Sequence, residues 1–244
     1  MKSCAWLLAF AVLALGISLP APAAVPGGDE VKKEEIVKVK LPEPKFDGAV
    51  SLEKAIRSRR SARDYTGEPI TLAQAAQLLW AAYGITEPMP DGPAFLRGGL
   101  RAAPSAGARY PFEVYLVAGK VTGLAAGVYR YVSEEHALVR VLDGDVRGAL
   151  SEAAYGQEWI RQAPASLFVS AIFERTTKKY GERGSQRYVW MDSGYLGENV
   201  YLQAEALGFG CCVAGAFDDG AVKLAMKLPA GEEPVCILAV GKKK

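Results

Sequence analysis

The chain has 244 residues, half of them hydrophobic, which suits one folded domain with a sizeable core. Its formal net charge of +2 excludes a strongly acidic or basic chain whose composition alone would indicate its partners. The single histidine, His136, excludes a histidine-rich zinc site, and it lacks the local motif of a Ser-His-Asp triad, so we expect no metal site.

Residues 1–24 have the pattern of a secretory signal peptide. Lys2 supplies a short positive start, Cys4 to Leu19 carries no charge, and residues 21–23 have the small-x-small pattern of a cleavage site. We therefore expect export to the periplasm or the cell exterior, with no stable membrane association after cleavage. The alternative is a retained membrane anchor, although the apolar stretch is shorter than the ~20 residues of a spanning helix.

Residues 25–47 are rich in Pro, Gly, Lys and Glu and poor in aromatic side chains. Such a segment cannot bury enough apolar surface to fold alone, and we expect a flexible linker. Residues 48–244 are then one domain.

Two helices are predicted at the start of this domain. Ser51 precedes apolar residues at helical spacing and is an expected N-cap. Thr71 and Gln74 match a capping box, after which an apolar stripe runs as far as Gly84. The next segment, residues 85–108, is rich in Pro and Gly, and so long a loop in a compact domain is usually functional or mobile.

The rest of the domain mixes strands and helices. Aromatic and β-branched residues predict strands at 112–118, 127–132, 139–142, 165–173, 210–214 and 235–240. Helical spacing predicts helices at 145–155, 188–207 and 218–226. Strands and helices do not alternate as they do in a doubly wound parallel sheet, so the expected fold class is α+β.

Several residues with chemical potential are better explained by structure. His136 lies between two predicted strands, which indicates a solvated hairpin position rather than a catalytic base. Cys211, Cys212 and Cys236 lack the spacing of a disulfide framework, and we expect small buried residues. The glycine-rich run at 208–215 leads from a helix into a strand, the reverse of a dinucleotide-binding turn.

A basic segment follows the first predicted helix. It contains Arg59, Arg60, Ser61 and Arg63. Guanidinium groups match phosphate oxygens two at a time, and a serine hydroxyl adds one more donor. The alternative is a solvated basic helix end. Aromatic residues are not interleaved with these arginines as base stacking requires, so we expect no nucleic acid partner.

Four motifs in order resemble the FMN-binding nitroreductases, and among them the SagB/ThcOx type of dehydrogenase. They are Arg-Arg-Ser-x-Arg-x-Tyr at 59–65, Pro-Ser-x-Gly-x-x-Tyr-Pro at 104–111, the long helix and turn at 192–210, and the closing segment at 215–241. Together they span essentially residues 50–244. Val213 and Gly215 stand where many nitroreductases have Pro and Glu, and this departure favours the SagB/ThcOx branch.

The resemblance implies a nitroreductase-like fold, with a central and mostly antiparallel sheet flanked by helices. It also implies an interlocked homodimer with two FMN sites at the subunit boundary. The basic segment would hold the phosphate and ribityl chain, and the Pro104–Gly107 loop of the partner subunit would pack near the ring. The implied cofactor-binding residues are Arg59, Arg60, Ser61, Arg63, Pro104, Ser105, Ala106, Gly107, Asn199, Gly215, Ala216, Lys242 and Lys243.

Lys179 and Tyr180 resemble the Lys-Tyr pair with which azoline-oxidising members transfer protons. Removing a hydride from a ring requires a proton to leave a neighbouring atom, and either side chain is a suitable acceptor. The alternative is a solvated loop between a strand and the long helix.

The resulting functional hypothesis is an FMN-dependent oxidoreductase. It would pass electrons between a small organic or peptide-derived substrate and a second donor or acceptor in a ping-pong cycle, with azoline-type dehydrogenation as the specific version. One alternative is an NAD(P)H-dependent reductase of quinones or nitro-compounds, although NAD(P)H is scarce outside the cytoplasm. A second alternative is a flavin- or peptide-binding module without turnover.

Overall fold

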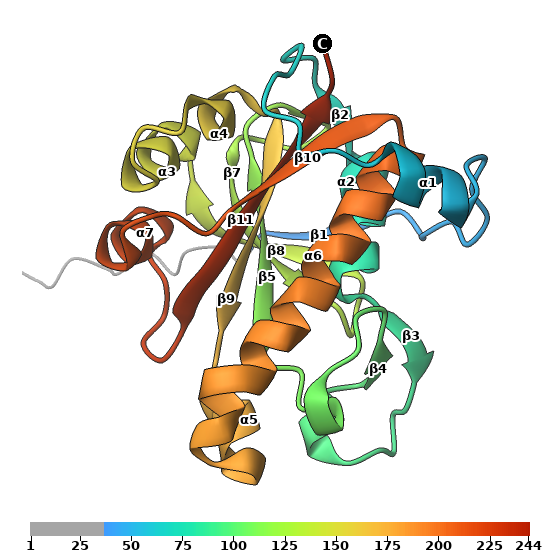
Figure 1. Ribbon diagram of the computed structural model, residues 1–244, viewed down its shortest axis with the longest axis vertical. Coiled ribbons are helices and arrows are strands. Elements are labelled where there is room, and N and C mark those ends of the chain that lie inside the picture. The colour runs from blue at the N-terminus through green and yellow to red at the C-terminus, as the bar shows by residue number, and fades with distance from the viewer. Residues whose placement is uncertain (1–36) are drawn as a thin grey trace, which may run out of the picture. The chain divides into compact units, whose positions relative to one another are not determined.

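The computed structural model describes residues 37–244, which form a seven-stranded sheet with helices on both faces (Figure 1). The strand order is β1-β8-β7-β5-β9-β11-β10, and every neighbouring pair is antiparallel. The strands are β1 (Lys38–Lys40), β5 (Phe112–Ala118), β7 (Gly127–Val132), β8 (Ala137–Asp143), β9 (Ala165–Ala171), β10 (Phe209–Ala214) and β11 (Glu233–Lys242). The α+β class with a mostly antiparallel sheet is confirmed.

Two small sheets lie beside the main one. In the first, β2 (Ile70–Thr71) pairs in parallel with β6 (Val121–Thr122). In the second, β3 (Ile85–Pro88) pairs antiparallel with β4 (Gly99–Arg101). The segment predicted as a long loop at 85–108 therefore contains a β-hairpin. Its strands are too short to show an alternating pattern in the sequence.

Within the described part of the chain, seven α-helices surround the sheet. They are α1 (Leu52–Ser58), α2 (Leu72–Tyr83), α3 (Arg147–Ala153), α4 (Glu158–Gln162), α5 (Glu174–Tyr180), α6 (Val189–Ala206) and α7 (Asp219–Met226). The N-cap at Ser51 and the capping box of Thr71 with Gln74 are confirmed. Within residues 37–244, no helix is both long and apolar enough to cross a membrane.

The sheet separates two hydrophobic cores, because successive side chains of a strand point to opposite faces. Leu116 on β5 packs in the core that α2 and α6 cover, whereas the next residue, Val117, packs in the core that α3, α4 and α7 cover. The helix α6 contributes Leu196 and Val200 to the first core. The result is a helix-sheet-helix arrangement in which α6 lies along one face (Figure 1).

Three local expectations were wrong. Residues 38–40 were assigned to a linker, but they form the edge strand β1, and Leu41 is buried because the chain continues along the sheet. The segment containing Lys179 and Tyr180 is not a loop but the helix α5. Finally, the apolar residues at helical spacing after Ser51 are Leu52, Ala55 and Ile56, which were expected to form one face of the helix, yet only Ala55 is buried and the other two are exposed.

The three cysteines that follow residue 36 are buried and free, as expected for small core residues. His136 does lie in the turn between β7 and β8, but it is half-buried rather than solvated. Its ring nitrogens contact the Tyr131 hydroxyl at 2.8 Å and the Pro42 carbonyl oxygen at 2.9 Å. Burial lowers the pKa of this imidazole. The predicted signal peptide lies outside the described residues.

Candidate functional site

The basic segment runs from the end of α1 along the ends of β10 and β11. Ser61 is bridged to Cys211, and Tyr65 to Lys243. The buried Tyr65 donates its hydroxyl proton to the carbonyl oxygens of Ala62 and Ala239, at 2.6 and 3.1 Å. These bonds fasten the arginine-bearing segment to the sheet, so the backbone near Ser61 is held in one place.

Tyr201 of α6 organises the side chains at this corner. Its hydroxyl lies 3.2 Å from the Ser61 hydroxyl and accepts a hydrogen bond from the Val213 N–H at 2.9 Å. The Arg59 guanidinium lies 5.3 Å from the Tyr201 ring centroid, within cation–π range. Sequence reasoning missed Tyr201, although its position one residue after Val200 on the buried side of a long helix was a usable signal.

The corner carries an excess of positive charge. Arg59 has one carboxylate partner, Glu198, at 4.0 Å. Arg60 donates to the carbonyl oxygens of Arg57 and Arg59. Among residues 37–244, neither Arg60 nor Arg63 forms an ion pair. We call residues 59–63 the basic corner. Three guanidinium groups against one distant carboxylate, with a serine hydroxyl between them, suit a phosphate group.

Lys242 and Lys243, predicted as a second phosphate contact, each have a carboxylate partner. The Lys242 ammonium lies 2.9 Å from Glu68, and the Lys243 ammonium lies 2.9 Å from Glu205. Lys243 is beside the basic corner through its bridge to Tyr65. To bind a phosphate, Lys242 or Lys243 would first have to break its ion pair with Glu68 or Glu205.

The Pro104–Gly107 loop is fastened to the first turns of α6 by the buried Asp192. The Ser105 hydroxyl donates to this carboxylate at 2.6 Å, and the Ala106 N–H donates to both of its oxygens at 3.2 Å. The Ser105 oxygen in turn accepts from the Tyr110 N–H at 2.9 Å. Burial raises the pKa of Asp192, while these hydrogen bonds act in the opposite direction. The carboxylate therefore sets the shape of the loop.

Lys179 and Tyr180 lie directly against this loop. Gly107 has φ of +58°, and a Cβ built on it would lie 2.6 Å from the Lys179 Nζ and closer still to the Tyr180 hydroxyl. Glycine is thus the residue that leaves room for both side chains. The Tyr180 ring also packs edge-on against Tyr188, with 4.8 Å between centroids. The predicted pair and the predicted ring-binding loop meet in one place.

The basic corner and the Pro104–Gly107 loop do not meet within one chain. Their anchors on α6, Tyr201 and Asp192, are nine residues apart (201 − 192). That spacing is about 13 Å along the helix axis and half a turn around it, at 1.5 Å and 100° per residue. Within one subunit, the two predicted cofactor-binding groups are therefore separate.

Asn199 lies elsewhere. Its side-chain amide donates to the Ala81 carbonyl oxygen at 3.1 Å and lines a groove of about 730 Å³ between α1, α2 and α6. Its contacts join two helices and do not reach the basic corner. It is therefore better explained as a helix–helix contact.

Gly215 and Ala216 follow β10 and are exposed. The Ala216 carbonyl oxygen accepts from the Gln157 side chain at 2.9 Å. A Cβ at Gly215 would meet nothing within 4 Å, so this chain's own packing does not require glycine there. The open surface is compatible with close approach of a ligand. Among residues 37–244, no three Asp, Glu, His or Cys side chains are close enough to hold a metal ion.

Comparison with known families gives one match over most of the chain. A profile described as "Nitroreductase family" matches residues 56–242. A protein of Methanocaldococcus jannaschii, provisionally named a nitroreductase, is 41% identical over 80% of this chain and 92% of its own length. The trifolitoxin-processing protein TfxB of Rhizobium leguminosarum is 35% identical over 44% of this chain and 30% of its own length.

Solved structures agree on the fold. A provisionally named nitroreductase from Anabaena variabilis has a TM-score of 0.72 and 27% identity, over 86% of this chain and 42% of that one. Another from Ralstonia eutropha has a TM-score of 0.70 and 28% identity, over 85% of this chain and 90% of that one. The Escherichia coli microcin synthetase McbBCD complex was solved with truncated pro-MccB17 bound. It has a TM-score of 0.62 and 24% identity, over 87% of this chain and 79% of that one. This chain thus spans less than half of the Anabaena protein and of TfxB.

Proposed function

This chain belongs to the nitroreductase family of oxidoreductases, and we propose that it is an FMN-dependent member that dehydrogenates a small organic or peptide-derived substrate. Electrons would pass to a second substrate that visits the same site in turn. We also propose that it is of the SagB/ThcOx type, and the sequence motifs support this assignment through Val213 and Gly215.

The observation that carries the proposal is the contact of Lys179 and Tyr180 with Gly107. When bound, FMN supplies hydride transfer. A carbon that loses a hydride must have a proton removed from a neighbouring atom, and in this proposal the unprotonated Lys179 amine or the Tyr180 side chain would receive it at the loop.

The residues present fit the cofactor's phosphate. Arg59, Arg63 and the Ser61 hydroxyl would bind the phosphate oxygens, because the basic corner has more positive charge than its own carboxylates neutralise. In this proposal the Pro104–Gly107 loop of a second subunit would orient the ring and exclude water. Gly215 and Ala216 would face its open edge.

We also propose a homodimer, because in this proposal the loop of a second subunit completes the FMN site. Trp190, Met191 and Tyr195 lie on the outward side of α6 with 45–49% of each exposed. Adjacent exposed aromatic and sulfur-containing side chains on a long helix are typical of an interface. In the proposed dimer, this side of α6 would pack against a second copy, and the Pro104–Gly107 loop of each subunit would lie against the other subunit.

The peptide-derived substrate has partial support. TfxB, which resembles 44% of this chain, is named for processing trifolitoxin. The relative from M. jannaschii supports the second candidate, reduction of a nitro-compound or quinone with a nicotinamide donor. The predicted signal peptide favours the first, since an exported enzyme would meet little NAD(P)H. Export itself is a proposal, and N-terminal sequencing of the mature protein tests it.

The test is an anaerobic titration of the purified protein after reconstitution with FMN. We expect the flavin absorbance near 450 nm to bleach with a thiazoline- or oxazoline-containing peptide and to return with an electron acceptor. Bleaching by NADPH and return with a nitro-compound would support the second candidate instead. A protein that takes up no FMN at micromolar supply would contradict both.

A further inference from the structure

A second cluster of arginines lies behind the candidate site. It lines a cavity of about 260 Å³ among the β3–β4 hairpin, the ends of β5 and β7, and α5. Its charged lining residues are Arg97, Arg101, Glu113, Arg130, Glu134 and Arg175. Neither the proposed flavin chemistry nor the proton transfer uses them.

Three of the arginines share one carboxylate. Arg97 and Arg175 each donate to the same oxygen of Glu113, at 2.9 and 2.6 Å. Arg130 lies 3.9 Å from the other oxygen. The Glu113 side chain is only 10% exposed. Since one carboxylate carries a single negative charge, this group alone has a net charge of +2.

The fourth arginine does not change the balance. Arg101 is paired with Glu134 at 3.2 Å. Its guanidinium also lies 5.0 Å from the Tyr83 ring and 4.8 Å from the Tyr110 ring, and it donates to backbone carbonyl oxygens. This pair is a neutral structural element. The cavity therefore keeps a charge of +2, from four arginines and two glutamates.

We propose that this cavity binds a phosphate dianion, either free or as a phosphomonoester. Guanidinium groups brought together beside a single carboxylate repel one another, and an oxyanion with two negative charges would neutralise the excess. The Arg130 side chain is 45% exposed, and within residues 37–244 its one ion pair is 3.9 Å long, so its other N–H groups are available to a ligand. The volume accommodates a phosphate group and several linked atoms.

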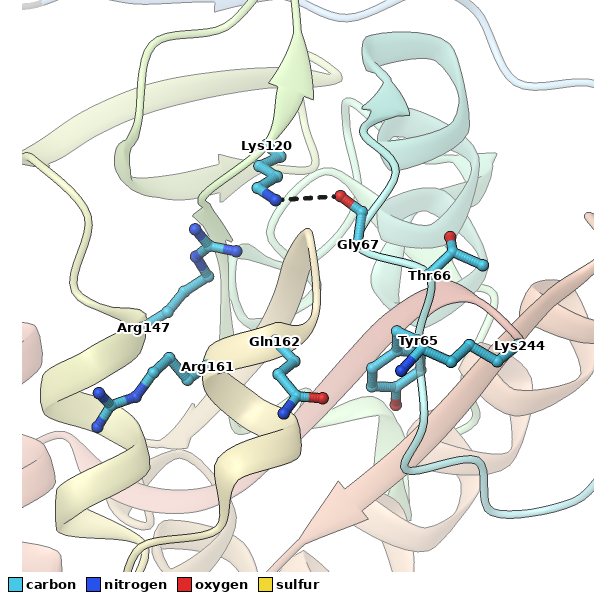
Figure 2. Close-up of a pocket in the computed structure, with 8 residues that line it drawn as sticks. All are labelled: Tyr65, Thr66, Gly67, Lys120, Arg147, Arg161, Gln162 and Lys244. Carbon is cyan, nitrogen blue, oxygen red and sulfur yellow. Dashed lines mark hydrogen bonds between the residues drawn. The ribbon is translucent and has the colours of Figure 1, made fainter.

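Another basic pocket, of about 320 Å³, is lined by Lys120, Arg147, Arg161 and Lys244 (Figure 2), and carboxylates outside its lining balance their charge. Arg147 is paired with Asp145, Lys244 with Asp64, and Lys120 donates to the Gly67 carbonyl oxygen. Arg161 has two carboxylate partners, Glu152 and Glu158. Within residues 37–244, three of these four cations have carboxylate partners, and the four carboxylates together offset the four positive charges. No charge is left over, and we propose no ligand there.

The arginine cavity is adjacent to the candidate site. Arg97 donates to the Tyr110 carbonyl oxygen at 2.7 Å, at the point where the Pro104–Gly107 loop joins β5. Arg175 is one helical turn before Lys179 on α5. A bound phosphate would therefore stabilise the positions of the loop and of α5 through Arg97 and Arg175. A phosphorylated substrate portion or a free ion would act in the same way.

Isothermal titration with inorganic phosphate and with phenyl phosphate tests the proposal. The full protein is reconstituted with FMN, and ionic strength is kept constant with chloride. The pH is set about two units above the second pKa of a phosphomonoester, which is about 6, so that inorganic phosphate, which loses its second proton at a higher pH, is also mainly the dianion. We expect Arg130→Gln to weaken phosphate binding about tenfold, the loss of one or two charge-assisted hydrogen bonds. Arg130→Lys keeps the positive charge but loses the forked pair of guanidinium donors, and it should give an intermediate loss of affinity.

Two matched controls remove the same charge elsewhere. Arg161→Gln acts in the balanced pocket of Figure 2 and should leave phosphate binding unchanged. Arg59→Gln removes the phosphate contact of the basic corner, and binding that depends on Arg59 but not on Arg130 would overturn the proposal. So would an absence of phosphate binding at millimolar concentration. Binding of phenyl phosphate at least as tight as that of phosphate indicates a phosphomonoester, and its exclusion indicates the free ion.

Discussion

Ser105 and Asp192 are joined by a hydrogen bond of 2.6 Å, which connects the Pro104–Gly107 loop to the beginning of α6. The carboxylate accepts from the Ser105 hydroxyl and the Ala106 N–H, and it is almost completely buried. The buried carboxylate of Asp192 therefore positions the loop that contacts Lys179 and Tyr180.

Asp192→Asn is expected to loosen this loop. The amide keeps one oxygen acceptor in place of two, and its NH2 group faces either the Ser105 hydroxyl or the Ala106 N–H, so one of these part-buried donors loses an acceptor. We expect the free energy of unfolding in urea to fall by about 1–3 kcal/mol. Asp219→Asn, an exposed change in the first turn of α7, is the control. A loss no larger than that of the control would show that Asp192 does not hold the loop.

Gly107→Ala is expected to lower turnover by displacing the Lys179 and Tyr180 side chains. A Cβ there would overlap both, in addition to the strain of a positive φ. Gly144→Ala is the matched control, because Gly144 also has positive φ, +88°, but has open space around it. Both variants should lose about 1 kcal/mol of stability from backbone strain. Only Gly107→Ala should change kcat, and equal kcat values would argue against the pair's role.

Lys179→Ala and Tyr180→Phe are expected to slow substrate dehydrogenation. Loss of a positioned proton acceptor typically costs about 10²- to 10⁴-fold in rate, while FMN affinity should not change. Stopped-flow bleaching of the flavin measures the step directly. Lys178→Ala is the control, because Lys178 is exposed and is paired with Glu174 at 3.0 Å. Unchanged rates in both variants would mean that the proton leaves by another route.

Arg59→Gln is expected to weaken FMN binding about tenfold, through the loss of charge-assisted hydrogen bonds to the phosphate. Riboflavin, which lacks the phosphate, should bind the variant and the parent protein equally. Quenching of flavin fluorescence measures both affinities. Arg57→Gln removes an exposed arginine from the last turn of α1 and serves as control. An equal loss for riboflavin would show that Arg59 acts on the fold rather than on the phosphate.

His136 provides a pH test of the β7–β8 turn. Its pKa is lowered by burial below the ordinary value of 6.5. Between the lowered folded pKa and the unfolded pKa, the unfolded chain binds more protons, so the free energy of unfolding falls as the pH falls through this window. Because the chain has one histidine, its ring proton signal in NMR reports the folded pKa directly. A midpoint at or above 6.5, or the same acid sensitivity in His136→Gln, would contradict this account.

Much of the fold could be predicted because its signals are local. The strands at 112–118 and 127–132 have the expected bounds, and the capping box of Thr71 and Gln74 forms as expected. The strands β3 and β4 were missed because they have too few residues for a period to be visible. The helix α5 was missed because its residues are almost all polar or charged and show no apolar period. The edge strand β1 was missed because its stability comes from pairing with β8 and not from its own composition.

The sequence by itself determined the family resemblance, the type of fold and the residues with useful chemistry, because motif spacing and side-chain periodicity are written within short stretches of chain. Only the tertiary structure decided which of these residues meet. Ser61 contacts Tyr201 across 140 residues, and Ser105 contacts Asp192 across 87. The same packing directed Asn199 toward Ala81 and gathered Arg97, Arg130 and Arg175 around Glu113. Contacts of this kind depend on how the helices pack on the sheet, and no local pattern contains that geometry.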